Sequence, residues 1–333
     1  MRTFREIREE QEKLLLSPYG TLSSASRGRP VPEAEDDVRT CFQRDVDRIT
    51  HSKAFRRLRH KTQVFLRPEG DHYRTRLTHT LEVARVGRTI ARALGLNEDL
   101  TEAIALGQDL GHTPFGHAGE RALRDITGSF HHYEQSLRVV DKLEKEGQGL
   151  NLCYETRMGI LNHTTGEPKN TPEADVVRLA DHIAYLNHDL DDAQRAGIVL
   201  AEDVPQIIRD RVGTRNSQRI NTMVTDAIEN SVEGNIALSP AMQEAYAAFE
   251  EFMYAAVYHN PTAKGEESKV KGILEPIMDY YTKNADRLPP EFLAIAEAEG
   301  VMTAVTDYVS GMSDGYAIDV FENLFIPASW SVK

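Results

Sequence analysis

The chain has 333 residues, enough for one large domain or for a catalytic domain with an extension. Its 39 Lys and Arg residues against 52 Asp and Glu residues give a net charge of −13, which argues against a nucleic-acid groove built on overall positive charge. Two cysteines without metal-ligand spacing, and no run of about 18 apolar residues, argue against a disulfide framework, a signal peptide and a membrane span, and predict a cytoplasmic protein.

Helical spacing of apolar residues dominates the sequence, and β-type alternation is nearly absent. Residues 17–36 are rich in Ser, Gly and Pro, which predicts a surface loop. Apolar residues recur at helical spacing up to Gly95, a natural helix stop, and Asn97 predicts the cap of a second helix that ends near Asp109. Thr171 followed by Pro172 predicts the start of a third helix.

The helical pattern continues beyond residue 200 with polar linkers between the segments and no internal repeat. The sequence therefore predicts an all-α protein in three parts. These are an N-terminal helix and loop (residues 1–44), a core that carries the chemistry (45–200) and a helical C-terminal extension (201–333).

Histidines are concentrated in one part of the sequence. Five of the twelve fall within about a sixth of the chain: His79, His112, His117, His131 and His132. A lone histidine is more often a satisfied polar residue than a ligand, but imidazole with carboxylate is a ligand set that divalent metals prefer. The cluster therefore indicates a metal site.

His79, Asp109 and Asp181 each lie on, or at the edge of, a helix with strong apolar periodicity. Each can project from a packed bundle into one interior site, as ligands do in metal centres of helical bundles. An acid at the C-terminal end of a helix, such as Asp109, opposes the helix dipole and needs a positive partner. A divalent metal would supply that charge.

Asp181, Tyr185 and Asp189 follow one another at spacings of four, on one face of the third helix. A metal-bound carboxylate, an aromatic ring under a sugar and a carboxylate for a hydroxyl group would explain this stripe. Arg76, three residues before His79, would share the face of that ligand. Six basic residues would either hold phosphates or form an ordinary solvated face: Arg56, Arg57, Arg59, Lys61, Arg74 and Arg76.

Six segments carry a resemblance to a known family. They are FRRLRHKTQVF, DHYRTRLTHTLEVARVGRTIARAL, DLGHTPFGHAGE, HHYEQSLRVV, ADHIAYLNHDLDDA and SGMSDGYAIDVFENLFIP. In this order, and over nearly the whole chain, they resemble the deoxyguanosine triphosphate triphosphohydrolase (dGTPase-like) branch of the HD-domain phosphohydrolases. The resemblance implies an all-α HD-domain helical bundle that uses a divalent metal to split a dNTP into a deoxynucleoside and inorganic triphosphate.

Carried over residue by residue, the resemblance implies three sets of site residues. The metal set would be His79, Gln108, Asp109 and Asp181. The catalytic set would be His112, His117, Glu120 and His132, in which His117 acts near the leaving oxygen and Glu120 orients it. The substrate-binding set would be Gln63 for the sugar or base, Arg76 for phosphate, Tyr185 for the deoxyribose and Asp189 for the 3′-hydroxyl.

Gln108 departs from the family pattern, which has histidine at this position. An amide oxygen is a hard, neutral and weak donor, so we expect Mg²⁺ or Mn²⁺, with Fe, Ni, Co and Zn as alternatives. Loss of a ligand should lower affinity or activity by at least about 10–100-fold, which predicts a weakened hydrolase. Gln108 is either a natural variant or a substitution introduced to trap substrate. Gly315 also departs from the family, whose members usually have arginine there.

Three functions remain open at this point. The first is a triphosphohydrolase for dGTP or other dNTPs, the second an HD phosphohydrolase acting on other nucleotides, and the third a nucleotide-binding regulatory protein whose metal site has decayed. The expected partner is a dNTP substrate, and a second, regulatory dNTP is left open. The resemblance also implies a homo-oligomer, in which amphipathic C-terminal helices would form an interface or simply cover the core.

Overall fold

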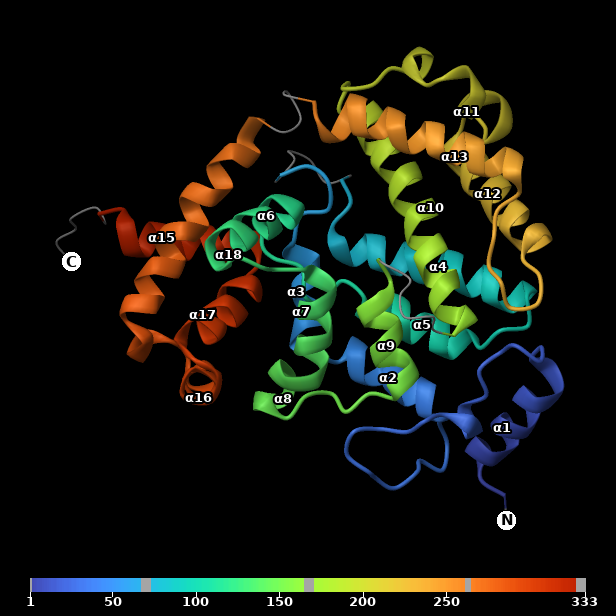
Figure 1. Cartoon of the computed structure of the whole chain (residues 1–333), viewed down its shortest axis with the longest axis horizontal. Helices are drawn as coiled ribbons and strands as arrows, with labels where there is room; N and C mark the ends of the chain where they lie inside the picture. The colour runs from blue at the N-terminus through green and yellow to red at the C-terminus, as the bar shows by residue number, and fades with distance from the viewer. Residues whose placement is uncertain (1, 67–72, 165–170, 261–264, 328–333) are drawn as a thin grey trace, which may run out of the picture.

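The computed structural model describes residues 2–66, 73–164, 171–260 and 265–327 (Figure 1). Within these ranges the chain forms helices and no β-strand, so the predicted all-α fold is confirmed. No helix in them is long and apolar enough to cross a bilayer. Asp71 and His72, which open one of the motifs quoted above, lie outside the described residues.

The helices of the first two hundred residues are α1 (Phe4–Leu15), α2 (Cys41–Thr50), α3 (Lys53–Arg57), α4 (Arg76–Ala93), α5 (Glu98–Gly107), α6 (Gly116–Thr127), α7 (His132–Arg138), α8 (Glu144–Gly147), α9 (Tyr154–Asn162) and α10 (Pro172–Arg195). Those that follow are α11 (Gln206–Arg211), α12 (Asn216–Asn230), α13 (Pro240–Met253), α15 (Val270–Lys283), α16 (Pro290–Glu299), α17 (Val301–Ser310) and α18 (Asp314–Phe325). Two π-helical turns, η3 (Val139–Leu143) and η5 (Tyr254–Tyr258), extend α7 and α13.

The predicted helix boundaries are confirmed by the capping contacts. The Asn97 side chain accepts hydrogen bonds from the backbone at the start of α5, and Thr171 does the same for α10, whose first residue is Pro172. Gly95 adopts a left-handed φ of +65° directly after α4, which a glycine does without strain. Local sequence chemistry therefore sets where the helices that carry the site begin and end.

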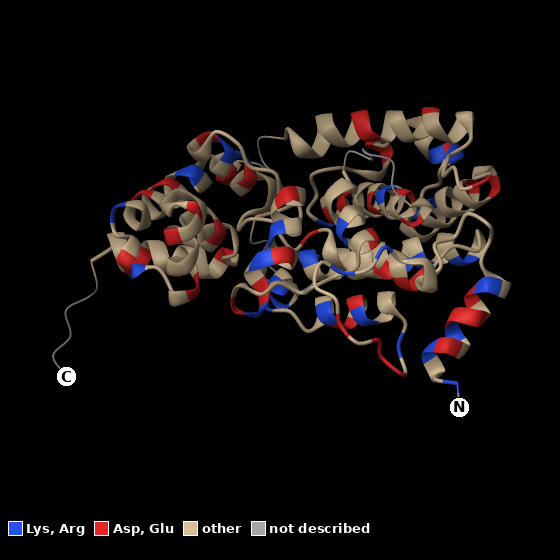
Figure 2. Cartoon of the chain, turned by 60° about the horizontal axis from the view of Figure 1, so that its bottom comes forward, with Lys and Arg blue, Asp and Glu red and all other residues tan. Residues whose placement is uncertain are grey.

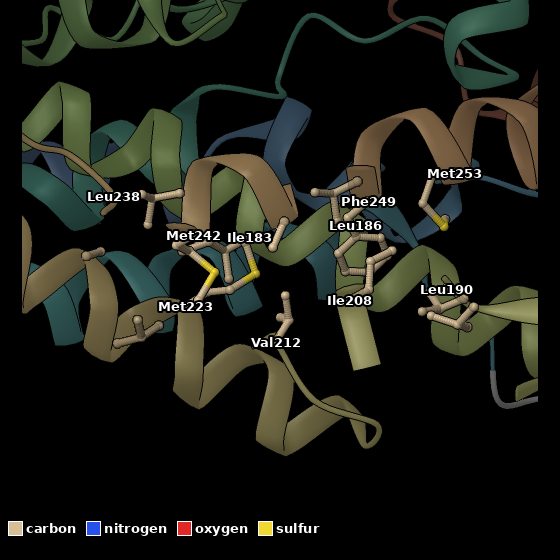
Figure 3. Close-up of a cluster of buried hydrophobic side chains, with 14 of the residues drawn as sticks. Ile183, Leu186, Leu190, Ile208, Val212, Met223, Leu238, Met242, Phe249 and Met253 are labelled. Atoms are coloured by element: carbon tan, nitrogen blue, oxygen red, sulfur yellow. The ribbon is translucent and has the colours of Figure 1, made fainter. Parts of the chain in front are cut away.

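Helix α10 lies between two apolar clusters. Ile183 and Leu190 on one face pack with residues of α4, α11, α12 and α13 (Figure 3), and Val177 and Ala184 on another face pack with α2, α5 and α9. Full burial of a Val, Leu or Ile side chain stabilises the fold by about 1.5–3 kcal/mol. The double packing fixes the rotation of α10 and leaves one face for polar residues.

A third apolar cluster joins α6 to α15, α17 and α18. These C-terminal helices gather at the end of the molecule opposite α12 and α13 (Figure 1), and acidic and basic residues occur in the helices of both ends (Figure 2). The predicted divisions after residues 44 and 200 stay predictions. The first apolar cluster contains residues from helices before and after residue 200, and so does the third, which connects the C-terminal helices to α6. The parts before and after residue 200 therefore share apolar clusters.

Candidate active site

One cavity of about 490 Å³ is lined by residues of α4, α6, α10, η5 and the loops beside them. Eleven of the twelve predicted site residues line it: Gln63, Arg76, His79, Asp109, His112, His117, Glu120, His132, Asp181, Tyr185 and Asp189. Gln108, the twelfth, is fully buried beside it and contacts Asp181. The three predicted sets thus come together in one place.

The predicted metal set brings three helices together. His79 of α4 places Nε2 2.9 Å from Oδ1 of Asp181 on α10, and the Gln108 amide nitrogen at the end of α5 donates to the same oxygen at 3.2 Å. Arg76 donates to Asp109 Oδ2 at 3.0 Å. The positive partner that the helix-terminal Asp109 needs is therefore present in the chain itself, as a guanidinium buried beside it.

These contacts shift the pKa values of the groups involved. Burial opposes the charged form of His79, but Asp181 outweighs burial and raises the pKa of the imidazole. Burial would raise the pKa of Asp109, but Arg76 and His112 hold it well below the usual range of a carboxyl group. Burial opposes ionisation of Asp181 as well, yet His79 lowers its pKa. Both carboxylates are thus ionised and suited to a cation.

The donor set fits a divalent metal in part. His79, Asp109 and Asp181 supply an imidazole and two carboxylates, and Gln108 Oε1 is a buried oxygen without a hydrogen-bond partner in the part of the chain described. The amide of Gln108, however, turns its nitrogen toward Asp181. A nitrogen that carries protons repels a cation. Gln108 can therefore bind a metal only through Oε1, and to bind one beside Asp181 its amide must be reversed so that Oε1 takes the place of the nitrogen.

The loop between α5 and α6 is shaped by close contacts that only glycine permits. A Cβ at Gly111 would lie 2.1 Å from the backbone nitrogen of Ser136, and one at Gly119 would lie 1.9 Å from the carbonyl oxygen of Pro114. Phe115 adopts a left-handed φ of +64° just before α6, which is costly for a bulky residue. The loop conformation must therefore be held from outside.

Asp314, the first residue of α18, supplies that support. Its Oδ1 accepts the Phe115 backbone N–H at 2.9 Å, and its Oδ2 accepts the Thr62 backbone N–H at 3.0 Å and the Thr62 hydroxyl. Lys61 donates its ammonium to the carbonyl oxygens of His112 and, at 2.9 Å, Ser310 of α17. The C-terminal helices thus fix the segments that carry Gln63 and His117.

His117, Glu120 and His132 form one side of the cavity, the loop side, in which both histidines contact Glu120. His117 places Nδ1 3.2 Å from Glu120 Oε2. His132 donates its backbone N–H to Glu120 Oε1 at 3.0 Å and places its Nδ1 3.1 Å from Glu120 Oε2. Despite burial, these histidines lower the pKa of Glu120 far below its usual range, so this carboxylate is ionised. The His117 side chain is 64% exposed, which leaves its Nε2 edge accessible to a ligand in the cavity.

Burial followed by the charges of Arg76 and His132 holds the pKa of His112 well below its usual range, so this imidazole is neutral. Its ring lies 4.0 Å from that of His132 between centroids, and its Nδ1 is 3.1 Å from Asp109 Oδ1. His112 therefore lies between the loop side and the predicted metal set of His79, Gln108, Asp109 and Asp181, which is called the metal side below.

The end of the cavity around Tyr185 and Asp189 contains residues that the sequence did not predict. The Tyr258 hydroxyl of η5 donates to Asp189 Oδ2 at 2.8 Å, and the Tyr185 hydroxyl donates to Glu250 of α13 at 3.0 Å. Burial raises the pKa of both tyrosines, so they stay protonated. The stripe of Asp181, Tyr185 and Asp189 is confirmed as one face of α10 that lines the cavity.

The predicted phosphate-binding role of the basic set needs correction. Arg76 lines the cavity, and its Nη2 is buried without a hydrogen-bond partner among the described residues. Arg74 instead forms ion pairs with Glu82, Asp191 and Asp192, and Lys61 is buried against carbonyl groups. Arg121 and Arg124 of α6, absent from the predicted set, line the cavity. Which arginines line the cavity depends on how the helices and loops pack, and residue spacing alone does not show this.

His163 is a further histidine that was not predicted. It follows α9 directly, lines the cavity and places Nε2 3.3 Å from Nε2 of His132. Among the described residues, two groups of side chains bring ligand atoms within 4.8 Å of one another: His112, His117, Glu120 and His132, and Asp109, His132 and His163. Neither group includes His79 or Asp181, so the predicted metal set as a whole does not already converge to this distance in the part of the chain that the structure describes.

Comparison with known proteins places these residues in a family context. Residues 76–186 match the HD domain, and residues 236–323 match the phosphohydrolase-associated domain. A deoxyguanosinetriphosphate triphosphohydrolase-like protein of Caldanaerobacter subterraneus is 53% identical over 98% of this chain and 97% of that protein. One of Clostridium tetani is 44% identical over 98% and 97%. A solved phosphohydrolase from Bacteroides thetaiotaomicron shares the fold, with a TM-score of 0.51 and 17% identity over 83% of this chain and 68% of that one.

Proposed function

Because the chain belongs to the family of deoxyguanosinetriphosphate triphosphohydrolase-like proteins, which are HD-domain phosphohydrolases, we propose that it cleaves a dNTP to a deoxynucleoside and inorganic triphosphate. dGTP is the first substrate to test, and other dNTPs are the second. One arrangement supports this most: the exposed His117 with Glu120 behind it shares a cavity with the His79–Asp181 pair and with Arg76.

The residues of the cavity divide the work of such a reaction. Arg76, whose Nη2 has no hydrogen-bond partner among the residues that the structure describes, neutralises and orients phosphate. Glu120 accepts a hydrogen bond from Nδ1–H of His117, and doubly protonated His117 delivers its Nε2 proton to the 5′-oxygen as the bond from that oxygen to the α-phosphorus breaks. Water forms the new bond to the α-phosphorus, so its oxygen remains in the triphosphate; the proton it loses goes to solvent, from which the His117 ring is protonated again.

A divalent ion held by His79, Asp109 and Asp181 would supply polarisation of the α-phosphate and a nucleophile of lowered pKa. Mg²⁺ and Mn²⁺ match the two carboxylates best, because these ions prefer oxygen donors. We propose that Gln108 weakens this site, since its amide nitrogen faces Asp181.

Deoxyribose would lie against Tyr185, with its 3′-hydroxyl on Asp189. Tyr258 already donates to Asp189 Oδ2, so the carboxylate is held in place to accept a further donor. Gln63 lines the cavity and keeps a buried Oε1 without a partner within the ranges that the structure covers. It is placed for the sugar or base. A regulatory dNTP and a homo-oligomer stay predictions.

The product distinguishes the proposal from other HD chemistries. The protein would be incubated with dGTP and Mn²⁺ or Mg²⁺, and the products separated by anion-exchange chromatography. We expect deoxyguanosine and intact triphosphate in equal amounts. Orthophosphate released from nucleoside monophosphates, with no triphosphate from any dNTP, would instead show a phosphohydrolase for other nucleotides.

The Gln108 amide facing Asp181 also favours a second candidate, a nucleotide-binding regulatory protein. Such a protein would show a rise in melting temperature with dNTPs but no turnover with any divalent metal.

A further inference from the structure

The two cysteines of the chain, Cys41 and Cys153, are far apart in the sequence but belong to one apolar cluster. Cys41 is the first residue of α2 and is half-buried, and Cys153 directly precedes α9 and is fully buried. Both are free thiols, and neither belongs to a group of metal-ligating side chains among the described residues. What the pair can do therefore depends on the two sulfur atoms themselves.

Polar contacts hold the start of α2 against the start of α9. Asp45, one turn after Cys41, accepts the backbone N–H of Cys153 at 2.9 Å. Arg29 donates to Asp45 Oδ1 at 2.5 Å and to the carbonyl oxygen of Cys41 at 2.8 Å. Residues four apart lie on the same face of a helix, so Cys41 lies on the face of α2 that meets Cys153. These contacts hold the two backbone segments side by side without help from the sulfur atoms.

The two thiols interact with each other. The Cys41 thiol, followed by burial, raises the pKa of the Cys153 thiol. Cys41 also directs its S–H to the carbonyl oxygen of Ser23 at 3.4 Å. Because the thiolate is the nucleophile in cysteine chemistry, the buried and protonated Cys153 does not react with an oxidant by itself. Cys41 is the partly exposed member of the pair, so an oxidant from solvent reaches it first.

We propose that Cys41 and Cys153 are a redox modification site, at which a peroxide converts the two thiols to an intramolecular disulfide. In the first step the Cys41 sulfur bonds to one oxygen of hydrogen peroxide, the O–O bond breaks, and the second oxygen leaves as water with the Cys41 proton. In the second step the Cys153 sulfur forms the S–S bond and displaces the hydroxyl group of the Cys41 sulfenic acid, which leaves as water with the Cys153 proton. Two thiols are thus oxidised, and one peroxide is reduced to two waters.

The disulfide would join α2 to the start of α9, the helix that leads directly to His163 in the cavity. It would also close a loop that contains α4 to α8, which limits the freedom of the unfolded chain and raises the melting temperature. The alternative is that the two thiols only fill the apolar cluster, as buried cysteines commonly do. The site does not rest on the proposed dNTP reaction, so either can fail without the other.

The test counts free thiols in the full chain. Reduced protein would be treated with hydrogen peroxide, unfolded, alkylated with iodoacetamide and analysed by mass spectrometry of the intact chain and of its peptides. We expect both thiols to be lost together, a mass lower by two hydrogen atoms, and one peptide pair that links Cys41 to Cys153 within a monomer. A dithiol reductant should reverse both the link and the rise in melting temperature.

Two matched variants separate the steps. Cys153→Ser removes the second sulfur, so Cys41 should stop at the sulfenic acid, which dimedone traps. In Cys41→Ser the buried Cys153 should still be alkylated after the same treatment. Free thiols that survive in the parent, separate oxidation of each cysteine to sulfinic acid, or links only between chains would overturn the proposal. The measurement on the parent decides even if a variant does not fold, because it needs no substitution.

Discussion

The two sides of the cavity are built in different ways. His79 and Asp181 on the metal side belong to α4 and α10, long helices that pack on each other and on α5. His117 on the loop side follows a left-handed Phe115 that is held by Asp314, 199 residues further along the chain. The metal side is thus set by local helix chemistry, and the loop side by distant tertiary contacts.

Replacing His117 should have the largest expected effect, a loss of catalysis without a loss of metal affinity. His117→Ala lacks the proton donor for the leaving oxygen, so we expect kcat for dNTP cleavage to fall by about 10²–10⁴-fold. Metal affinity depends on residues on the other side of the cavity. It should therefore stay within about twofold of the parent value, because substitutions at independent sites have independent effects. Steady-state kinetics and calorimetric titration with Mn²⁺ measure the two quantities. A large loss of metal affinity would show that the sides are not separate.

Asp314 tests whether the C-terminal helices support the loop side. Asp314→Asn replaces the carboxylate that accepts from Phe115 and Thr62 by a neutral amide, so unfolding free energy should fall by about 1.5–3 kcal/mol. We also expect a lower kcat. Urea unfolding and kinetics would be compared with Asp319→Asn, an exposed position on the same helix that should behave as the parent. Unchanged stability in Asp314→Asn would remove the proposed support.

Tyr258 connects the end of the cavity around Tyr185 and Asp189 to the C-terminal half of the chain. Tyr258→Phe removes the hydrogen bond to Asp189, worth about 0.5–1.5 kcal/mol, so KM for dNTPs should rise by about 2- to 10-fold with kcat nearly unchanged. Tyr254→Phe, at an exposed residue that also lines the cavity, is the control. If KM does not rise, Asp189 does not depend on this tyrosine for its position.

Lys61 should make stability depend on pH. Burial, followed by the charge of Arg57, lowers its pKa to about 7, against about 10.4 in an unfolded chain. Between these values the unfolded chain binds more protons, so stability rises with pH, by about 1 kcal/mol from pH 7 to pH 8. Lys61→Met should abolish this slope in urea unfolding, whereas the exposed Lys283→Met should keep it. A slope that survives in Lys61→Met would assign the pH dependence to another group.

The sequence predicted most of the fold, because capping residues and apolar spacing are local signals, and it named residues that the structure brings to one cavity; their role as metal ligands stays a prediction. Asn97, Thr171 and the α10 stripe all behave as expected. It did not predict His163 or Tyr258, since neither belongs to a recognised spacing and each reaches the cavity through the packing of a separate element. Local chemistry can identify residues on one helix, but it does not show which distant residues join them.

The basic set illustrates the same limit. Arg74 and Arg76 are two residues apart, yet Arg74 pairs with acids of α10 while Arg76 lines the cavity. The density of positive charge along the sequence therefore did not show which arginines line the cavity.

The most direct measurement of the central claim is triphosphate release from dGTP by this chain and by Gln108→His, with Mg²⁺ and Mn²⁺ assayed separately. Restoring an imidazole on the metal side, with the loop side already complete, should raise turnover by more than about tenfold. No triphosphate from either protein with any divalent metal, while dNTPs still raise the melting temperature, would contradict the hydrolase and leave a nucleotide-binding protein.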